Sequence, residues 1–145
     1  MANANRKARV LALQVLYEAD STSHSLPATL DRSVLESGMT EERAALTREL
    51  VEGVAANRQR LDAIIQEHAP SWPVDQLSAV DRNILRIAIF EILMNNRTPP
   101  KAAINEAVEL SKTFGGENIH RFINGVLGSV MARLGAEQET PTGRT

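Results

Sequence analysis

The stretch INEAVELSKTFGGENIHRFINGVL, from Ile104 to Leu127, decides the fold of this 145-residue chain. Apolar residues recur on both sides of Gly115 and Gly116 at the i, i+3, i+4, i+7 spacing of amphipathic helices. The pattern therefore predicts two helices joined by a tight glycine turn. The apolar stripe before the turn is Ile104, Ala107, Val108 and Leu110, and the stripe after it is Ile119, Phe122, Ile123, Val126, Leu127, Val130, Met131 and Leu134.

The rest of the chain shows the same helical periodicity, and no segment has the alternation of a strand. We expect further helices from about 4 to 20, from Pro27 to near Gly38, after Thr40 through Val54, around Leu61 to Ile65, and from Ala79 to about Asn95. Thr40 is the expected N-cap of the helix that follows it, and Ser78 with Asp81 resembles a capping box before the last helix, with Asp in place of the usual Glu or Gln. The last of these helices is apolar nearly all round, which is typical of a centrally buried helix. The sequence predicts an all-α fold of about seven helices.

These helices are expected to form one domain over residues 1–134, because 145 residues suit a single core. The Pro-containing connection near 70–78 suggests a seam between two small helical subdomains, about 4–69 and 72–134. Residues 135–145 are polar and contain Gly and Pro, so we expect a flexible tail.

Bulk composition excludes several classes of protein. Hydrophobic residues make up 43% and charged residues 23%, and no apolar run approaches the roughly 18 residues of a membrane span. No secretory signal follows the basic start, so a cytoplasmic location is expected. The chain has no cysteine, which rules out disulfides and thiolate metal sites. The net charge of −2 makes the local distribution of charge more informative than the total.

Three cations, Arg6, Lys7 and Arg9, open the first helix with no acidic residue before Glu18. Cations in the first turns oppose the helix dipole, so helix stability does not require them there. A phosphate partner would favour them. On charge alone, however, a solvated face with no partner is the favoured explanation.

Aromatic residues are few, although single-stranded RNA is usually gripped by stacking as well as by charge. Phe90 and Phe114 look like core, and Trp72 beside Pro73 is expected to pack at the seam. Phe122 lies on an apolar stripe, so it is either core or a ring with an exposed edge. Tyr17 suits a half-buried anchor or a contact surface.

Several polar residues interrupt the apolar faces of the predicted helices. We expect Glu91, on the central helix, to be paired with a structural donor. Asn105, Glu106 and Asn124 are expected to bond loop backbone, and Gly125 and Gly128 to permit a close approach between helices. Arg82 and Arg86 share a face at i, i+4, and this is either a solvated ridge or part of a partner surface.

The sequence contains no set of residues that would support an enzymatic activity. Glu117 and His120 form an E-x-x-H pair, but di-iron helical bundles need a second such pair and two more glutamates. No nucleophile elbow, Walker A sequence or dinucleotide-binding glycine motif is present. We therefore expect neither a catalytic site nor a metal or other cofactor.

Three ordered blocks resemble the NusB family of transcription antitermination proteins. They are RKARVLALQVLYEAD at 6–20, AVDRNILRIAIFEIL at 79–93 and AINEAVELSKTFGGENIHRFINGVLGSV at 103–130. The resemblance covers residues 5 to 134. It implies an all-α fold of two helical subdomains and a protein that is not an enzyme.

The resemblance also implies partners. Proteins similar to this one bind boxA RNA together with NusE, a small-subunit ribosomal protein, and help RNA polymerase read through termination signals. By this resemblance the RNA surface contains Arg6, Lys7, Arg9, Tyr17, Asn118 and Phe122, and Asp81 and Arg82 lie toward NusE. Two departures are an asparagine at 118, where relatives can carry aspartate, and an arginine cluster interrupted by Lys7.

Two other interpretations stay open at this point. One is a relative of the helical RNA-binding domain that occurs fused to ribosomal RNA cytosine methyltransferases. The other is a helical protein–protein adaptor without an RNA role. The family contains both monomers and homodimers, so either oligomeric state is compatible with the sequence.

Overall fold

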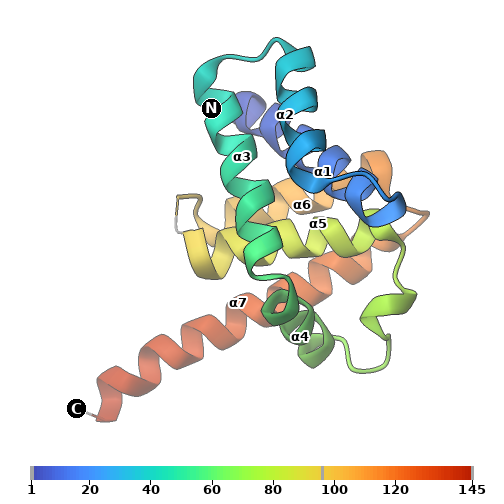
Figure 1. Cartoon of the computed structure of the whole chain (residues 1–145). Coiled ribbons are helices and arrows are strands. Elements are labelled where there is room, and N and C mark those ends of the chain that lie inside the picture. Colours follow the sequence, from blue (N-terminus) through green and yellow to red (C-terminus); the bar gives the residue numbers. More distant parts are fainter. Residues whose placement is uncertain (1, 96, 145) are drawn as a thin grey trace.

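The computed structural model describes the backbone of residues 2–95 and 97–144, and the side chains of residues 5–95 and 97–135. This part of the chain is all-helical, as predicted, with seven α-helices (Figure 1). The α-helices are α1 (Ala2–Ser21), α2 (Leu26–Ser37), α3 (Glu41–Ala56), α4 (Arg58–His68), α5 (Ala79–Phe90), α6 (Pro100–Phe114) and α7 (Ile119–Arg144). A short 3₁₀ turn, Val74–Gln76, precedes α5, and a π-helical turn, Glu91–Asn95, continues it.

Hydroxyl side chains begin three of the helices. The Oγ atoms of Ser25, Thr40 and Ser78 accept hydrogen bonds from the backbone N–H three residues later, which satisfies a donor that the helix leaves free. Helix α2 ends at Gly38, whose φ of 66° is in the left-handed region that favours glycine. The predicted limits of α2 and the predicted caps at Thr40 and Ser78 are confirmed.

Helix α5 is the centre of the molecule. It contacts α1, α3, α4, α6 and α7, and Figure 1 shows it crossing the middle of the fold. All its residues from Asn83 to Phe90 are buried, so the prediction of a central helix is confirmed. Helices α1, α2 and α3 pack together above it in this view.

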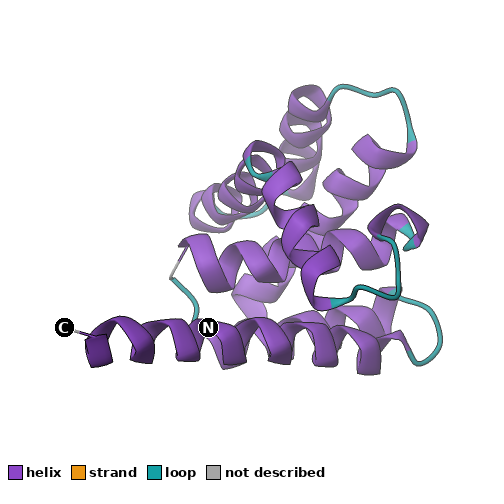
Figure 2. Ribbon diagram, turned by 90° about the horizontal axis from the view of Figure 1, so that it is seen from below, coloured by secondary structure: helices purple, strands orange, loops and turns teal. Residues whose placement is uncertain are grey.

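Helix α7 lies along one edge of the molecule, packed against α6, α5 and α4. Figures 1 and 2 both show its C-terminal part extending past the other helices. The expected flexible tail, 135–145, falls in this part, where side chains beyond 135 are outside those described. The flexibility of the tail therefore stays a prediction.

A network of charged side chains lies where α1, α4 and α5 meet. Arg86 is only 2% exposed, and its guanidinium donates to both carboxylate oxygens of Asp62 at 2.7 and 2.9 Å and to Asp20 at 3.0 Å. Arg86 is thus neither part of a solvated ridge nor part of a partner surface, because it is a buried tie between three helices. Helix α4, which the sequence placed with the first half, packs mainly on α5 and α7.

Helices α3 and α5 approach each other at Gly53. A Cβ atom at this position would lie 2.1 Å from Cζ of Phe90, so the ring occupies the space that any other residue would need. Phe90 is 8% exposed, which confirms its assignment to the core. Phe114 is 40% exposed, so the expectation that it belongs to the core is wrong.

Candidate nucleic-acid interface

Arg9, one of the three predicted surface cations, lies in the protein interior. It is 2% exposed, and its Nε and Nη2 atoms donate to the two oxygens of Glu91 at 2.8 and 2.7 Å. Thr98 bridges the same pair, accepting from Arg9 at 3.2 Å and donating to Glu91 at 3.1 Å. The prediction that Arg9 lies on an RNA surface is wrong for this structure, because its guanidinium is committed to a buried carboxylate. The expected pairing of Glu91 is confirmed.

Arg6 is paired as well, but its side chain stays 42% exposed. Its guanidinium donates to both oxygens of Glu106 on α6 at 3.0 and 2.9 Å. The hydrogen bond from Arg6 holds the pKa of Glu106 below its ordinary value, and the carboxylate raises the pKa of Arg6. Glu106 was expected to bond loop backbone, and that expectation is wrong. Arg6 remains accessible to a phosphate that competes with Glu106.

Lys7 is exposed and makes no ion pair with any described side chain. It lies on an open groove of about 740 Å³ between the start of α1 and the connection from α2 to α3. Arg43, which is partly exposed and likewise has no ion-pair partner among the described residues, contributes from α3. Arg6 also lines the groove, which thus carries three cations over an apolar floor that includes Val10 and Leu11.

A second groove adjoins the first along α1. It has a volume of about 360 Å³ and is lined mainly by apolar side chains, including Tyr17 of α1 and Phe114 of α6. Tyr17 is 46% exposed and Phe114 40%. Gln14 lines both grooves, and Lys7, Gln14 and Tyr17 share one face of α1 at i, i+7 and i+10. We call the exposed surface formed by Lys7, Gln14, Tyr17 and Phe114 the α1 strip.

The turn between α6 and α7 places the other two predicted RNA residues. Asn118 is exposed and has a φ of 65°, a conformation that asparagine tolerates better than most residues. A Cβ at Gly115 would lie 2.7 Å from the carbonyl oxygen of Ser111, so this tight turn requires glycine. Phe122, one turn into α7, is half-buried, and its ring centroid lies 5.1 Å from that of Trp72. The structure thus places Trp72 at the seam against a ring of α7.

The two residues predicted to face a protein partner are mostly covered. Asp81 is 7% exposed, and its Oδ1 has no hydrogen-bond partner among the described residues. The Arg82 side chain is 18% exposed and donates to the carbonyl oxygen of Leu77 at 2.9 Å. Neither side chain presents a large free surface, and their contact with a partner stays a prediction.

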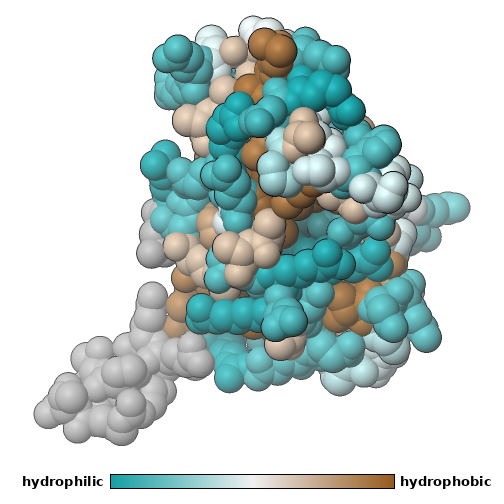
Figure 3. Space-filling model, viewed as in Figure 1, coloured by the Kyte–Doolittle hydropathy of each residue, from teal (hydrophilic) through white to brown (hydrophobic). Residues whose placement is uncertain are grey.

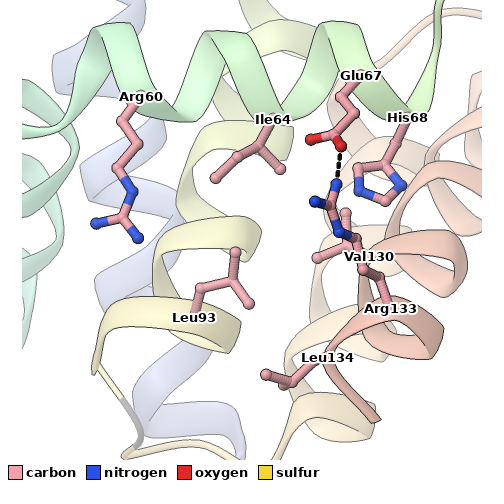
Figure 4. Close-up of a pocket in the computed structure, with 8 residues that line it drawn as sticks. All are labelled: Arg60, Ile64, Glu67, His68, Leu93, Val130, Arg133 and Leu134. Carbon is pink, nitrogen blue, oxygen red and sulfur yellow. Dashed lines mark ion pairs between the residues drawn. The ribbon is translucent and has the colours of Figure 1, made fainter. Parts of the chain in front are cut away.

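A cleft on another side of the molecule separates α4 from α7. Figure 4 shows Arg60, Ile64, Glu67 and His68 of α4 facing the α7 residues that line it, with an ion pair from Glu67 to Arg133. His68 is also hydrogen-bonded to Ser129, at 2.7 Å, which ties the two helices together. Within the described residues no cluster of three or more His, Asp or Glu could hold a metal ion.

The face seen in Figure 3 is mainly hydrophilic, with hydrophobic side chains visible between the helices. None of the helices, over the residues described, is long and apolar enough to cross a membrane.

A sequence model of the NusB family matches residues 6–132.

The chain belongs to the NusB family.

Relatives in the NusB family match it over nearly its whole length. The transcription antitermination protein NusB of Chloroflexus aggregans is 48% identical over 141 residues, which cover 96% of this chain and 94% of that protein. The protein of the same name from Dehalococcoides mccartyi strain 195 is 48% identical over 134 residues, covering 92% and 94%.

Solved structures of NusB proteins have the same fold. T. maritima NusB is 28% identical, with a TM-score of 0.81, and the match covers 87% of this chain and 89% of that one. A chain from a crystal structure of the antitermination factors NusB and NusE in complex with dsRNA is 26% identical, with a TM-score of 0.81 and coverage of 90% and 97%.

Three residues that line the two grooves along α1 were not among those selected from the sequence. Gln14 follows Lys7 by seven residues, and this spacing could have placed both on one face of α1. Phe114 stands directly before two glycines, which is a signal for a helix end where a ring can be exposed. Arg43 gave no signal, because it reaches the groove only through the packing of α3 on α1.

Proposed function

We propose that this chain is a transcription antitermination factor that binds boxA-type RNA together with NusE and acts on transcribing RNA polymerase. In this role it is a cytoplasmic RNA-binding protein and not an enzyme. The family's shared name and the solved complex of NusB and NusE with dsRNA support this proposal.

The observation that carries the proposal is the continuity of the α1 strip with the cationic groove. Arg6, Lys7 and Arg43 lie at one end, and exposed rings of Tyr17 and Phe114 lie at the other. Proteins that bind single-stranded nucleic acid combine a cationic groove, which tracks phosphates, with aromatic rings on which bases stack. The strip offers both kinds of contact side by side.

The structure leaves fewer cations available to contact phosphate than the sequence predicted. Arg9 is buried against Glu91, and Arg6 must exchange Glu106 for a phosphate. Lys7 and Arg43 are therefore the readily available cations of this groove. This distribution fits a protein whose net charge is only −2 and whose RNA contacts are completed by a second protein.

A titration of boxA-type RNA with and without NusE tests the proposal, with a scrambled RNA of equal length as the control. We expect tighter binding of the boxA-type RNA, and a larger difference between the two RNAs when NusE is present. Equal affinity for both RNAs in both conditions would refute it. Binding of NusE without any RNA dependence would instead favour the protein–protein adaptor.

A further inference from the structure

The chain's single tryptophan is only partly covered by the packing of the fold. Trp72 is 44% exposed, and its ring contacts only one other aromatic ring, that of Phe122. The two rings are inclined by 47°, within the range of favourable aromatic pairs. One part of the indole is thus supported from the α7 side while much of the rest faces solvent.

The loop that carries Trp72 is held in place by a single amide. The Nε2 atom of Gln66 donates to the carbonyl oxygens of Ala69 and Trp72 at 3.1 and 3.4 Å, and its Oε1 atom accepts from the N–H of Val74 at 3.1 Å. The N–H of Trp72 in turn donates to the carbonyl oxygen of Ala69 at 3.1 Å. The backbone on both sides of the indole is therefore fixed before any ligand arrives, which lowers the entropic cost of binding.

The surroundings of this ring pair suit a nucleic acid. Arg121, adjacent to Phe122 in the first turn of α7, is exposed and makes no ion pair within the described part of the chain. Asn118 is exposed in the turn directly before α7, four residues before Phe122 in the sequence. An exposed indole, a guanidinium one residue from its supporting ring in the sequence and a polar turn offer the kinds of contact that an unpaired base and its phosphate require.

We propose that Trp72, backed by Phe122, is a stacking site for one unpaired base of the bound RNA. The proposal rests on the RNA-binding function proposed above and adds to it a residue on the connection between α4 and α5. Because the rings are inclined, a base that lies flat on the indole cannot also lie flat on the phenyl ring. Trp72 is thus the stacking face, and Phe122 is the positioning residue that supports it.

The tryptophan is also its own reporter, since no other tryptophan contributes fluorescence. We expect its emission to be quenched when boxA-type RNA is titrated into the full-length chain. RNAs with one abasic nucleotide at successive positions then identify the stacked base, because a single position should abolish the quench. Because loss of one base stack on an aromatic ring weakens binding by roughly this much in other proteins, we expect Trp72→Ala to bind the RNA roughly 5- to 150-fold more weakly.

Two variants serve as controls for this test. Leu35→Ala removes another exposed apolar side chain, 82% exposed on α2, and should leave RNA affinity unchanged. Trp72→Phe keeps an aromatic face and should retain part of the affinity that Trp72→Ala loses. Circular dichroism and thermal unfolding establish that each variant is folded, and the wild-type fluorescence tests the proposal even if Trp72→Ala is not.

The outcomes separate this proposal from the one on which it rests. If the wild type binds RNA specifically without quenching, and Trp72→Ala binds it with unchanged affinity, the stacking site is overturned and the proposed function stays intact. A quench produced by NusE alone, or by raising the protein concentration without RNA, assigns the ring to a protein interface and also overturns it. Absence of specific RNA binding by the wild type, with and without NusE, refutes the proposed function itself.

Discussion

Two of the three cations that open α1 are bound to carboxylates of distant helices. Arg9 meets Glu91 of the central helix extension, and Arg6 meets Glu106 of α6. From the sequence, the cations were expected to contact phosphate, Glu91 to be paired with a structural donor and Glu106 to bond loop backbone. Their pairing explains both, because a buried charge is tolerated only when it is paired and hydrogen-bonded.

The Arg9–Glu91 pair makes a first prediction about single residues. Replacing Arg9 by Ala leaves the Glu91 carboxylate buried, with Thr98 as its one remaining hydrogen-bond partner among the described side chains, so we expect a loss of about 3–5 kcal/mol in the free energy of unfolding. Urea denaturation measures this loss. Lys7→Ala, on the same helix but exposed, is the control and should change stability by less than about 0.5 kcal/mol. An Arg9→Ala protein as stable as this control would contradict the structural role of the pair.

The Arg6–Glu106 pair predicts a dependence of stability on pH. Since the hydrogen bond from Arg6 lowers the pKa of folded Glu106, the pair stabilises the protein fully above the ordinary pKa of 4.5, and this contribution is lost as pH falls through the lower folded value. Glu106→Gln should therefore be less stable than the wild type at neutral pH, with the difference shrinking below pH 4.5.

Thermal unfolding across this pH range tests the prediction for Glu106. Glu109→Gln, which alters a half-exposed carboxylate of the same helix, provides the comparison. A stability difference for Glu106→Gln that stays constant down to the lowest pH would show that ionisation of Glu106 does not contribute to stability, and would contradict a lowered pKa in the folded protein.

The positions of the helices along the chain were predictable from the sequence, whereas the contacts between helices were not. The limits of α2 and the caps of α3 and α5 followed from Gly38, Thr40 and Ser78, since these signals act within a few residues. Local periodicity also identified α5 as central. The pairing of Arg6 with Glu106 spans 100 residues of sequence, so no local pattern contains it.

The same limit applies to the glycines. Gly125 and Gly128 were expected to let helices approach, yet a Cβ at either would have no neighbour within 4 Å, so that expectation is wrong. The close approach occurs instead at Gly53, which sits in an ordinary helical pattern of α3 and gave no signal. Which side of a helix a glycine faces depends on the packing of its partners.

Gly53 provides the prediction for a helix–helix contact. Alanine is intrinsically better than glycine inside a helix by roughly 0.5–1 kcal/mol, but here its Cβ would overlap the Phe90 ring at 2.1 Å. Because the ring is enclosed in the core, we expect overpacking to prevail and Gly53→Ala to destabilise the protein by about 1–3 kcal/mol. Chemical denaturation of this variant gives the sign directly.

Gly128→Ala is the matched control for Gly53→Ala. It is also inside a helix, but its added methyl group meets nothing within 4 Å, so the helix preference should appear as a gain of up to about 1 kcal/mol. Opposite signs for the two substitutions support the packing of α3 on α5. If both stabilise the protein, the Phe90 ring moves aside more easily than the structure indicates.

At the scale of the whole molecule, the candidate RNA-binding residues come from the four helices α1, α3, α6 and α7 and from the connections before α5 and before α7. The α1 strip takes Lys7, Gln14 and Tyr17 from one helix and Phe114 from another, while α3 supplies Arg43. The sequence could select Lys7 and Tyr17 from residue type and from family resemblance. It could not exclude Arg9, because burial of that guanidinium depends on where α5 continues beyond Phe90.

This assembly predicts how salt affects RNA binding. Each cation that neutralises a phosphate of single-stranded RNA adds about −0.7 to the slope of log affinity against log salt concentration. Lys7 is free to do so, and we expect Lys7→Ala to flatten the slope by about 0.7 and to weaken binding most at low salt. Arg60→Ala removes an exposed cation of α4 that lines the separate cleft beside α7, and it should leave the slope unchanged. Equal slopes for wild type and Lys7→Ala would place the phosphate contacts elsewhere, whereas a change in Arg60→Ala alone would move the RNA surface to the α4–α7 side of the molecule.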